Sequence, residues 1–136
     1  MSYFDGYLIP VPTEKLDAYR RFSEKIATVY REHGALRIVD CVLDPDTADG
    51  AQFHADEARD ALDLADAPLR DFRAAAAAEA GETVVLSWTE WPSKAARDAG
   101  LAKALSDPRV QPQEGQEVLF EGRRLIAGGF VGLMDV

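Results

Sequence analysis

Glu32-His33 is the part of this sequence best suited to proton transfer. Histidine titrates near neutrality and can act as an acid or a base in a cleft. The same His33 also ends a stripe of apolar residues, next to the expected C-terminus of a helix, where the helix dipole favours a cation. No nucleophile or second carboxylate accompanies it in the sequence, so a capping or packing role is the favoured interpretation.

Metal and cofactor chemistry have little support. His33, His54 and the single cysteine, Cys41, lie in unrelated contexts, so no metal site is expected. Cys41 alternates with apolar residues, which favours a small core residue over a nucleophile. Gly128-Gly129 lacks the spacing of a phosphate loop, and we expect a bulge or the close approach of another backbone there, with no cofactor.

Aromatic residues are numerous enough to line an apolar cavity between helices and a sheet, although ordinary core packing is the favoured explanation for them. Arg109, which follows Asp107-Pro108, could hold a carboxylate or pair with a neighbouring acid. The candidate pocket residues are therefore Tyr19, His33, Trp88, Arg109 and Phe130, with Tyr30 and Trp91 as further aromatic lining.

The first 43 residues predict a strand, a helix and a second strand. Residues 3–11 are rich in aromatic and branched side chains and end at prolines. A stripe with helical spacing runs from Leu16 to His33, and Gly34 supplies a C-terminal stop. The apolar run 36–43 then ends in the turn Asp44-Pro45-Asp46.

The C-terminal part repeats the pattern. Residues 83–91 alternate as a strand, and Ser93 is a good N-cap for a helix that Asp107-Pro108 stops. Residues 118–120 and 125–134 are predicted strands about the turn 121–123.

Two such units in tandem predict a single α+β domain over residues 1–136 with a ferredoxin-like βαββαβ arrangement. The four strands would form an antiparallel sheet with both helices on one face. A second copy of the chain is the expected cover for the other face, which predicts a homodimer.

Nearly all of the net charge of −9 lies in one segment. Residues 44–82 hold 11 acidic and 3 basic residues, against 13 and 12 in the rest of the chain. This segment looks helical, with Ala58, Ala61, Leu62 and Ala65 at helical spacing and Pro68 opening a further helix that Gly81 closes. The balanced remainder argues against nucleic acid or an anionic membrane as a partner.

Localisation follows from what the sequence lacks. A lone cysteine forms no internal disulfide, and the first residues do not resemble a signal peptide. No apolar run approaches the roughly 20 residues needed to cross a bilayer. We expect a cytoplasmic protein without a membrane span.

Several separate motifs, in order, give the chain a family resemblance. They are Asp5-Gly6-Tyr7, Pro10-Val11-Pro12, Lys15, Tyr19, Glu32-His33-Gly34-Ala35-Leu36, Glu82-Thr83-Val84-Val85-Leu86-Ser87-Trp88, Pro92-Ser93-Lys94, Arg97-Asp98-Ala99, Asp107-Pro108-Arg109, Phe120-Glu121-Gly122-Arg123-Arg124 and Gly128-Gly129-Phe130. The chain resembles the YbaA-like family, the domain of unknown function numbered 1428.

The resemblance covers residues 3–44 and about 71–135. Residues 51–69 look like an acidic helical insertion between the two halves. Ala127 replaces a tyrosine that the family usually has, and Val118-Leu119 replaces a methionine-proline pair. The resemblance implies a dimeric α/β barrel of ferredoxin-like subunits with no established activity.

Three functions fit these observations. The first is an uncharacterised dimeric module that binds a small, partly apolar molecule. The second is a cofactor-independent enzyme like the monooxygenases that use the dimeric α/β barrel, which rests on analogy of fold alone. The third is a structural or protein-interaction module whose acidic insertion contacts a partner. The absence of an obvious nucleophile, metal site or cofactor loop favours the first.

Overall fold

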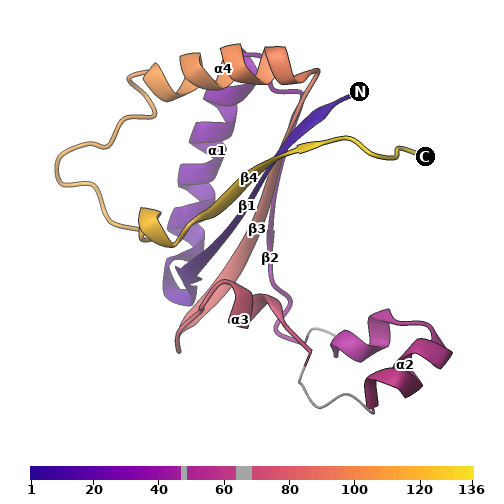
Figure 1. Cartoon of the computed structure of the whole chain (residues 1–136). Coiled ribbons are helices and arrows are strands. Elements are labelled where there is room, and N and C mark those ends of the chain that lie inside the picture. Colours follow the sequence, from indigo (N-terminus) through magenta and orange to yellow (C-terminus); the bar gives the residue numbers. More distant parts are fainter. Residues whose placement is uncertain (47–48, 64–68) are drawn as a thin grey trace.

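Four antiparallel strands form one sheet in the order β2-β3-β1-β4 (Figure 1). The computed structural model describes residues 1–46, 49–63 and 69–136. The strands are β1 (Tyr3–Pro12), β2 (Arg37–Val42), β3 (Glu82–Trp91) and β4 (Ile126–Val131). The sheet confirms the predicted α+β class, and its strand order is compatible with a ferredoxin-like fold.

The register of β1 decides which side chains share a face. Tyr3 lies opposite Trp91 on β3 and opposite Val131 on β4, and Ile9 lies opposite Val85. Because side chains alternate along a strand, the odd-numbered residues of β1 and their partners share one face.

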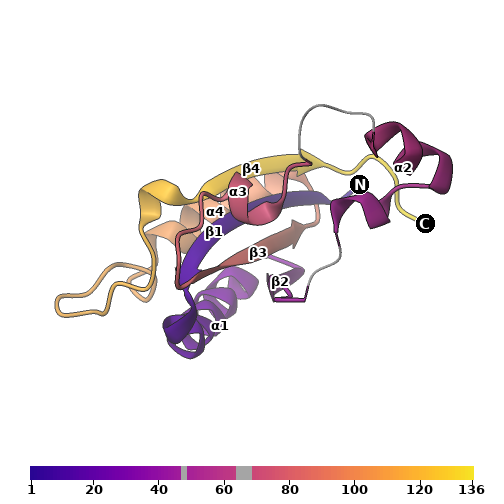
Figure 2. The ribbon, with the colours of Figure 1, turned by 90° about the horizontal axis from the view of Figure 1, so that it is seen from below.

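Helices α1 (Leu16–Glu32) and α4 (Lys94–Ser106) cover that odd-numbered face (Figures 1 and 2). Gly34 adopts φ +110°, a left-handed conformation that suits glycine after a helix and that the sequence predicted. Ser93 caps α4 by accepting a hydrogen bond from the amide of Ala96 at 3.1 Å, also as predicted.

The core lies between α1 and the two central strands. Ile9, Val11 and Val85 are buried there, and Leu16, Tyr19 and Phe120 pack against them. Tyr19 and Phe22 of α1 each contact Phe120 edge-on, with centroids 5.7 and 6.2 Å apart, and contact each other in a tilted arrangement at 6.3 Å. The aromatic cluster anchors the segment before β4 against α1.

Among the described residues, the even-numbered face is covered only at one end. Short helix α3 (Phe72–Ala75) lies over it, so that Ala76 and Val84 are buried, and it also walls a small cavity with Leu86. Farther along, Leu86, Ile126 and Phe130 are 43%, 49% and 59% exposed. Helix α2 (Asp56–Asp63) lies beyond the end of the sheet and covers none of this face (Figures 1 and 2).

The C-terminal strands differ from the prediction. Residues 118–120 form no strand, because Phe120 packs against α1 instead of pairing with a neighbouring strand. The last strand spans Ile126–Val131 rather than 125–134, since its partner β1 begins at Tyr3 and only the amide of Gly132 reaches a further carbonyl, that of Ser2.

Two predictions for the middle of the chain are also corrected. The alanine run forms one helical turn rather than a helix ending at Gly81, because Ala77 adopts φ +53° and the carbonyl of Ala77 accepts a hydrogen bond from Arg124. Pro68 and Ala65 lie outside the described residues. Cys41 is exposed rather than a core residue, since β2 is an edge strand.

Candidate functional site

A cavity of about 430 Å³ lies between α1 and edge strand β2. Its wall on α1 is built by residues on the helix face turned toward the sheet edge, and its other wall by β2 and by Val85 of β3. The lining comprises Leu16, Asp17, Tyr19, Arg20, Ser23, Glu24, Ala27, Ile38, Asp40, Cys41, Val42 and Val85. Of the sequence-based candidates, it contains Tyr19.

Asp40 is the polar centre of this cavity. Ser23 of α1 donates a hydrogen bond to Oδ2 of Asp40, and Ser87 of β3 donates one to Oδ1 at 2.5 Å. Two hydroxyls from different elements therefore fix the orientation of one carboxylate. Asp40 stays exposed at the sheet edge and forms no ion pair among the described residues.

Tyr19 keeps its proton at any physiological pH. Burial of the phenol, with a smaller contribution from the negative charge of Asp40, raises the pKa of Tyr19 to about 12. The side chain therefore offers a neutral ring, together with a hydroxyl, at the cavity wall.

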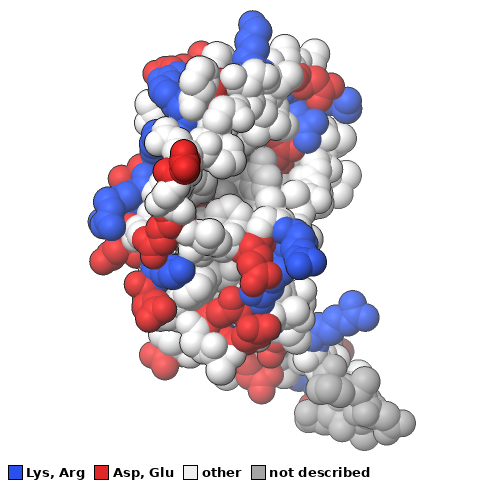
Figure 3. Space-filling view, turned by 90° about the vertical axis from the view of Figure 1, so that its left-hand side faces the viewer, with Lys and Arg blue, Asp and Glu red and all other residues white. Residues whose placement is uncertain are grey.

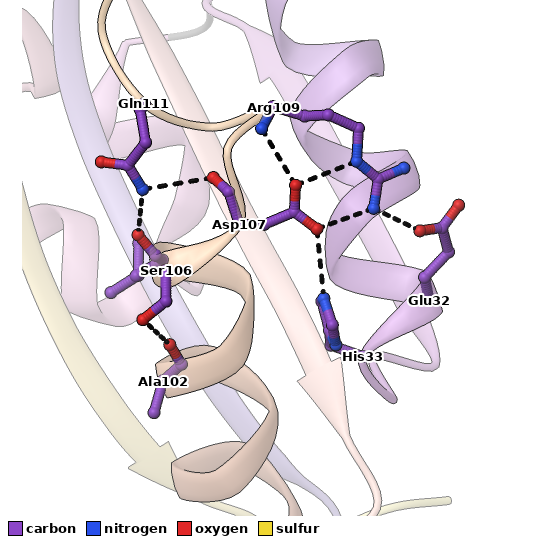
Figure 4. A network of polar contacts seen from close by, with 8 residues as sticks. Glu32, His33, Ala102, Ser106, Asp107, Arg109 and Gln111 are labelled. Carbon is purple, nitrogen blue, oxygen red and sulfur yellow. Dashed lines mark hydrogen bonds and ion pairs between the residues drawn. The ribbon is translucent and has the colours of Figure 1, made fainter.

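His33 and Arg109 lie together at a different place, in a polar network that joins the ends of α1 and α4 (Figure 4). Nε2 of His33 is 3.4 Å from Oδ2 of Asp107. Nε of Arg109 donates to Oδ1 of Asp107 at 3.0 Å, and Nη2 donates to Oδ2 at 2.8 Å and to Glu32 at 2.5 Å. These hydrogen bonds hold the pKa of Asp107 well below its usual range.

This network links two helices and shows no arrangement for nucleophilic catalysis. Ser106, the nearby hydroxyl in Figure 4, donates to the carbonyl of Ala102 in its own helix. Of the two roles considered for Arg109, pairing with neighbouring acids is the one observed. His33 likewise takes the capping position after α1.

Trp88 and Phe130 lie on the even-numbered sheet face, opposite the face that α1 and α4 cover. Trp88 contacts Phe4 edge-on with centroids 6.1 Å apart, and the guanidinium of Arg37 lies 5.3 Å from the centroid of its ring. The ring of Phe130 covers Gly6, whose strand position is opposite Trp88. The five candidate residues thus occupy three separate places rather than one cavity.

Comparisons with known proteins agree with one another. The model of a family described as "Protein of unknown function (DUF1428)" matches residues 2–122. The uncharacterised protein YbaA of Escherichia coli K12 is 42% identical over 135 residues, which cover 99% of each chain, and the YbaA proteins of Escherichia coli O157:H7 and Shigella flexneri match equally well. The chain belongs to the DUF1428 family. No biochemical activity is established for these relatives, which are themselves described as uncharacterised.

This DUF1428 chain also holds a buried charge that the sequence analysis missed. Asp5 is only 2% exposed, and it accepts hydrogen bonds from Nε1 of Trp91 at 3.1 Å and from Nε of Arg97 at 3.0 Å. The sequence does contain a feature that marks this charge as buried, because Asp5 interrupts an apolar strand on the same face as Tyr3 and Ile9.

Two phenols lie near this ion pair on the helix-covered face. Burial, followed by the proximity of Tyr30 and Asp5, raises the pKa of Tyr7 above its ordinary value. Burial, then Asp5, also raises the pKa of Tyr30, whose ring contacts Trp91 at 6.2 Å between centroids. Both hydroxyls therefore remain protonated and available as hydrogen-bond donors.

Other kinds of site find little support in the described part of the chain. Residues 1–46, 49–63 and 69–136 contain no group of three His, Cys, Asp or Glu side chains placed to hold a metal ion. No helix among them has the length and apolar character needed to cross a membrane. On the face shown in Figure 3, lysine and arginine are interspersed with acidic residues and form no continuous basic patch.

Proposed function

We propose that this protein is a homodimeric binding module for a small, partly apolar molecule, which it holds in the cavity between α1 and β2. The observation that carries the proposal is that cavity, whose volume of about 430 Å³ falls within the range of about 300–1,000 Å³ usual for small-molecule sites. Its walls are mainly apolar, and its polar groups converge on Asp40. This combination is typical of sites that enclose an apolar body and orient it by a few polar contacts.

The proposal gives the five candidate residues different roles. Tyr19 lines the cavity. His33 and Arg109 hold the ends of α1 and α4 together. Trp88 and Phe130 belong to the surface that contacts a second copy of the chain.

That second copy would cover the even-numbered sheet face and complete a dimeric α/β barrel. The four strands, two of ten residues and two of six, span about 500 Å² at about 3.3 Å per residue and ~4.8 Å between strands. This is about 60% of the ~800 Å² that each partner buries in an interface of standard size. The exposed Leu86, Ile126 and Phe130 supply the apolar centre that such an interface needs.

Ligand binding is tested with a thermal-shift screen of small aromatic amines, carboxylates and alcohols. A bound compound should raise the melting temperature, because binding to the folded state alone stabilises it. Ala27→Phe, which fills the cavity, should abolish the shift, whereas Ala102→Phe on the exposed surface of α4 should preserve it. A flat response across the library, or an unchanged response in Ala27→Phe, contradicts binding in this cavity.

Dimerisation is tested by multi-angle light scattering at micromolar concentration. We expect twice the chain mass for the wild type and a single chain mass for Phe130→Glu, which places a charge in the proposed interface. Leu105→Glu is the matched control, because Leu105 is 52% exposed on α4, away from the interface. A monomeric wild type, or a Phe130→Glu variant that remains dimeric, refutes this assembly.

The exposed thiol of Cys41 fits a cytoplasmic location, since unpaired exposed thiols persist in reducing compartments.

A further inference from the structure

We propose that the ligand held between α1 and β2 is an amine: a small molecule with an apolar body and a protonated nitrogen that pairs with Asp40. This inference rests on the proposed function and narrows its ligand class.

The charges around the cavity select for a cation. Three acids line it, Asp17, Glu24 and Asp40, against one base, Arg20. None of the four takes part in an ion pair within the described residues, so these acids are not neutralised by partners of their own. A carboxylate ligand would meet this negative field, while an ammonium group would be attracted to it.

The carboxylate of Asp40 is already held in a fixed orientation in which it can accept a hydrogen bond from an ammonium group. The hydroxyls of Ser23 and Ser87 each hold one of its oxygens and stop the carboxylate from rotating. A carboxylate has about four lone-pair positions, so two hydrogen bonds leave others for a ligand N–H. Charge-assisted hydrogen bonds of this kind are stronger than neutral ones, and a fixed acceptor loses less entropy when it binds.

The apolar walls of the cavity indicate the nature of the rest of the ligand. Ala27, Ile38 and Val42 surround Asp40 with aliphatic surface, and Tyr19 adds an aromatic ring that remains neutral. An aromatic face also attracts a nearby ammonium group. An aromatic or aliphatic ring joined to a primary amine by a short chain matches this distribution of contacts.

Three probes of similar shape and different charge test the inference: 2-phenylethylamine, 3-phenylpropanoate and 2-phenylethanol. Their dissociation constants are measured by calorimetry at low salt, and amide shifts at Ala27 and Val42 locate the bound probe. We expect the amine to bind at least about tenfold more tightly than either of the others. Asp40→Asn should weaken amine binding about tenfold, and Asp60→Asn, in the exposed α2, should leave it unchanged.

The double variant Asp17→Asn, Glu24→Gln provides a second test that does not touch the hydrogen bonds of Asp40. It should weaken amine binding severalfold. Equal affinity for amine and alcohol, tighter binding of the carboxylate, or an unchanged Asp40→Asn overturns the amine assignment while leaving a binding module in place. Failure of all three probes also overturns it, and the wider thermal-shift screen then decides the proposed function independently.

Discussion

Arg97 of α4 and Asp5 of β1 form an ion pair that spans 92 positions of the chain. Nε of Arg97 lies 3.0 Å from both carboxylate oxygens of Asp5, and Nη2 lies 2.8 Å from Oδ1. The Asp5 side chain is 3% exposed, and that of Arg97 is 26% exposed. The pair therefore fixes α4 on the sheet through a charge that water cannot easily reach.

Arg97→Ala should lower the free energy of unfolding by about 3 kcal/mol, because it leaves the Asp5 charge buried with the indole of Trp91 as its one remaining side-chain donor among the described residues. Arg97→Lys should lower the free energy of unfolding by less, since it keeps the positive charge but not the bidentate geometry. Urea unfolding measures both. Lys94→Ala, which breaks an exposed pair with Asp98, is the control and should cost under about 0.5 kcal/mol. An Arg97→Ala variant as stable as this control would contradict the role of the pair.

Glu82 should make stability depend on pH. Nη1 and Nη2 of Arg124 each donate to its carboxylate at 2.8 Å, and together with the amide of Glu79 they lower the pKa of Glu82 from 4.5 to about 2. The folded state thus holds the ionised form, and the stabilisation is complete above pH ~4.5. As the pH falls from about 4.5 toward 2, the unfolded chain takes up a proton first and the stabilisation disappears.

Glu82→Gln tests this linkage by thermal unfolding at pH 6.5 and at pH 2.5. The variant should be about 1 kcal/mol less stable than the wild type at the higher pH. The difference should shrink at the lower pH, because protonation of the unfolded chain removes most of the stabilisation that Glu82 gives the wild type. Glu14→Gln, an exposed acid at the start of the chain, should match the wild type throughout. If the stability difference between Glu82→Gln and the wild type grew toward low pH, the predicted direction of the pH dependence would be wrong.

Gly100 sets how closely α4 approaches the sheet. A Cβ at this position would lie 2.5 Å from Cζ3 of Trp91 and would also meet the carbonyl oxygen of His33. Alanine favours a helix by up to ~1 kcal/mol over glycine, but overpacking against a fixed ring and a backbone costs more. Gly100→Ala should therefore destabilise by about 1–2 kcal/mol in urea unfolding. Gly122→Ala, where a Cβ meets nothing within 4 Å, should be nearly neutral, and equal effects would contradict the packing argument.

Arg109 should govern how firmly the segment after α4 is held. Arg109→Ala removes the donors that tie Asp107 to Glu32 across two helices, so the following residues should open more often. Cleavage by a glutamate-specific protease at Glu114 and Glu117 should become severalfold faster. Arg123→Ala, an exposed residue in the turn before β4, serves as the control. Weaker carboxylate binding without faster cleavage would instead favour a ligand-binding role for Arg109.

Local patterns were sufficient to predict much of the fold. The alternation over 83–91 matches β3 to within one residue, and the cap at Ser93 and the glycine stop at Gly34 mark helix ends that the structure confirms. These features depend on near neighbours in sequence, so the sequence expresses them directly. Residues 118–120 were wrongly predicted as a strand, because Phe120 packs against α1, which is distant in the sequence.

The candidate site was harder to predict because it depends on faces and on pairing between distant elements. Trp88 and Trp91 are three residues apart on one strand, and alternation places them on opposite sides of the sheet. The cavity takes Ser23 and Asp40 from two elements, while Ser87 of a third element holds Asp40, and nothing in the sequence links these three residues. Only the spatial arrangement of α1, β2 and β3 brings these polar groups together.

The strand order has a consequence for how the chain folds as it is synthesised. β1 has β3 and β4 as its neighbours, and both come from the second half of the chain, whereas β1 and β2 do not touch. A nascent chain that has emerged only as far as β2 cannot form this sheet, and its first strand finds no partner until β3, which begins at Glu82, has emerged. Such non-local pairing slows folding and leaves apolar segments exposed in the meantime. The N-terminal half of the chain therefore stays without its sheet partners until β3 and β4 have been synthesised.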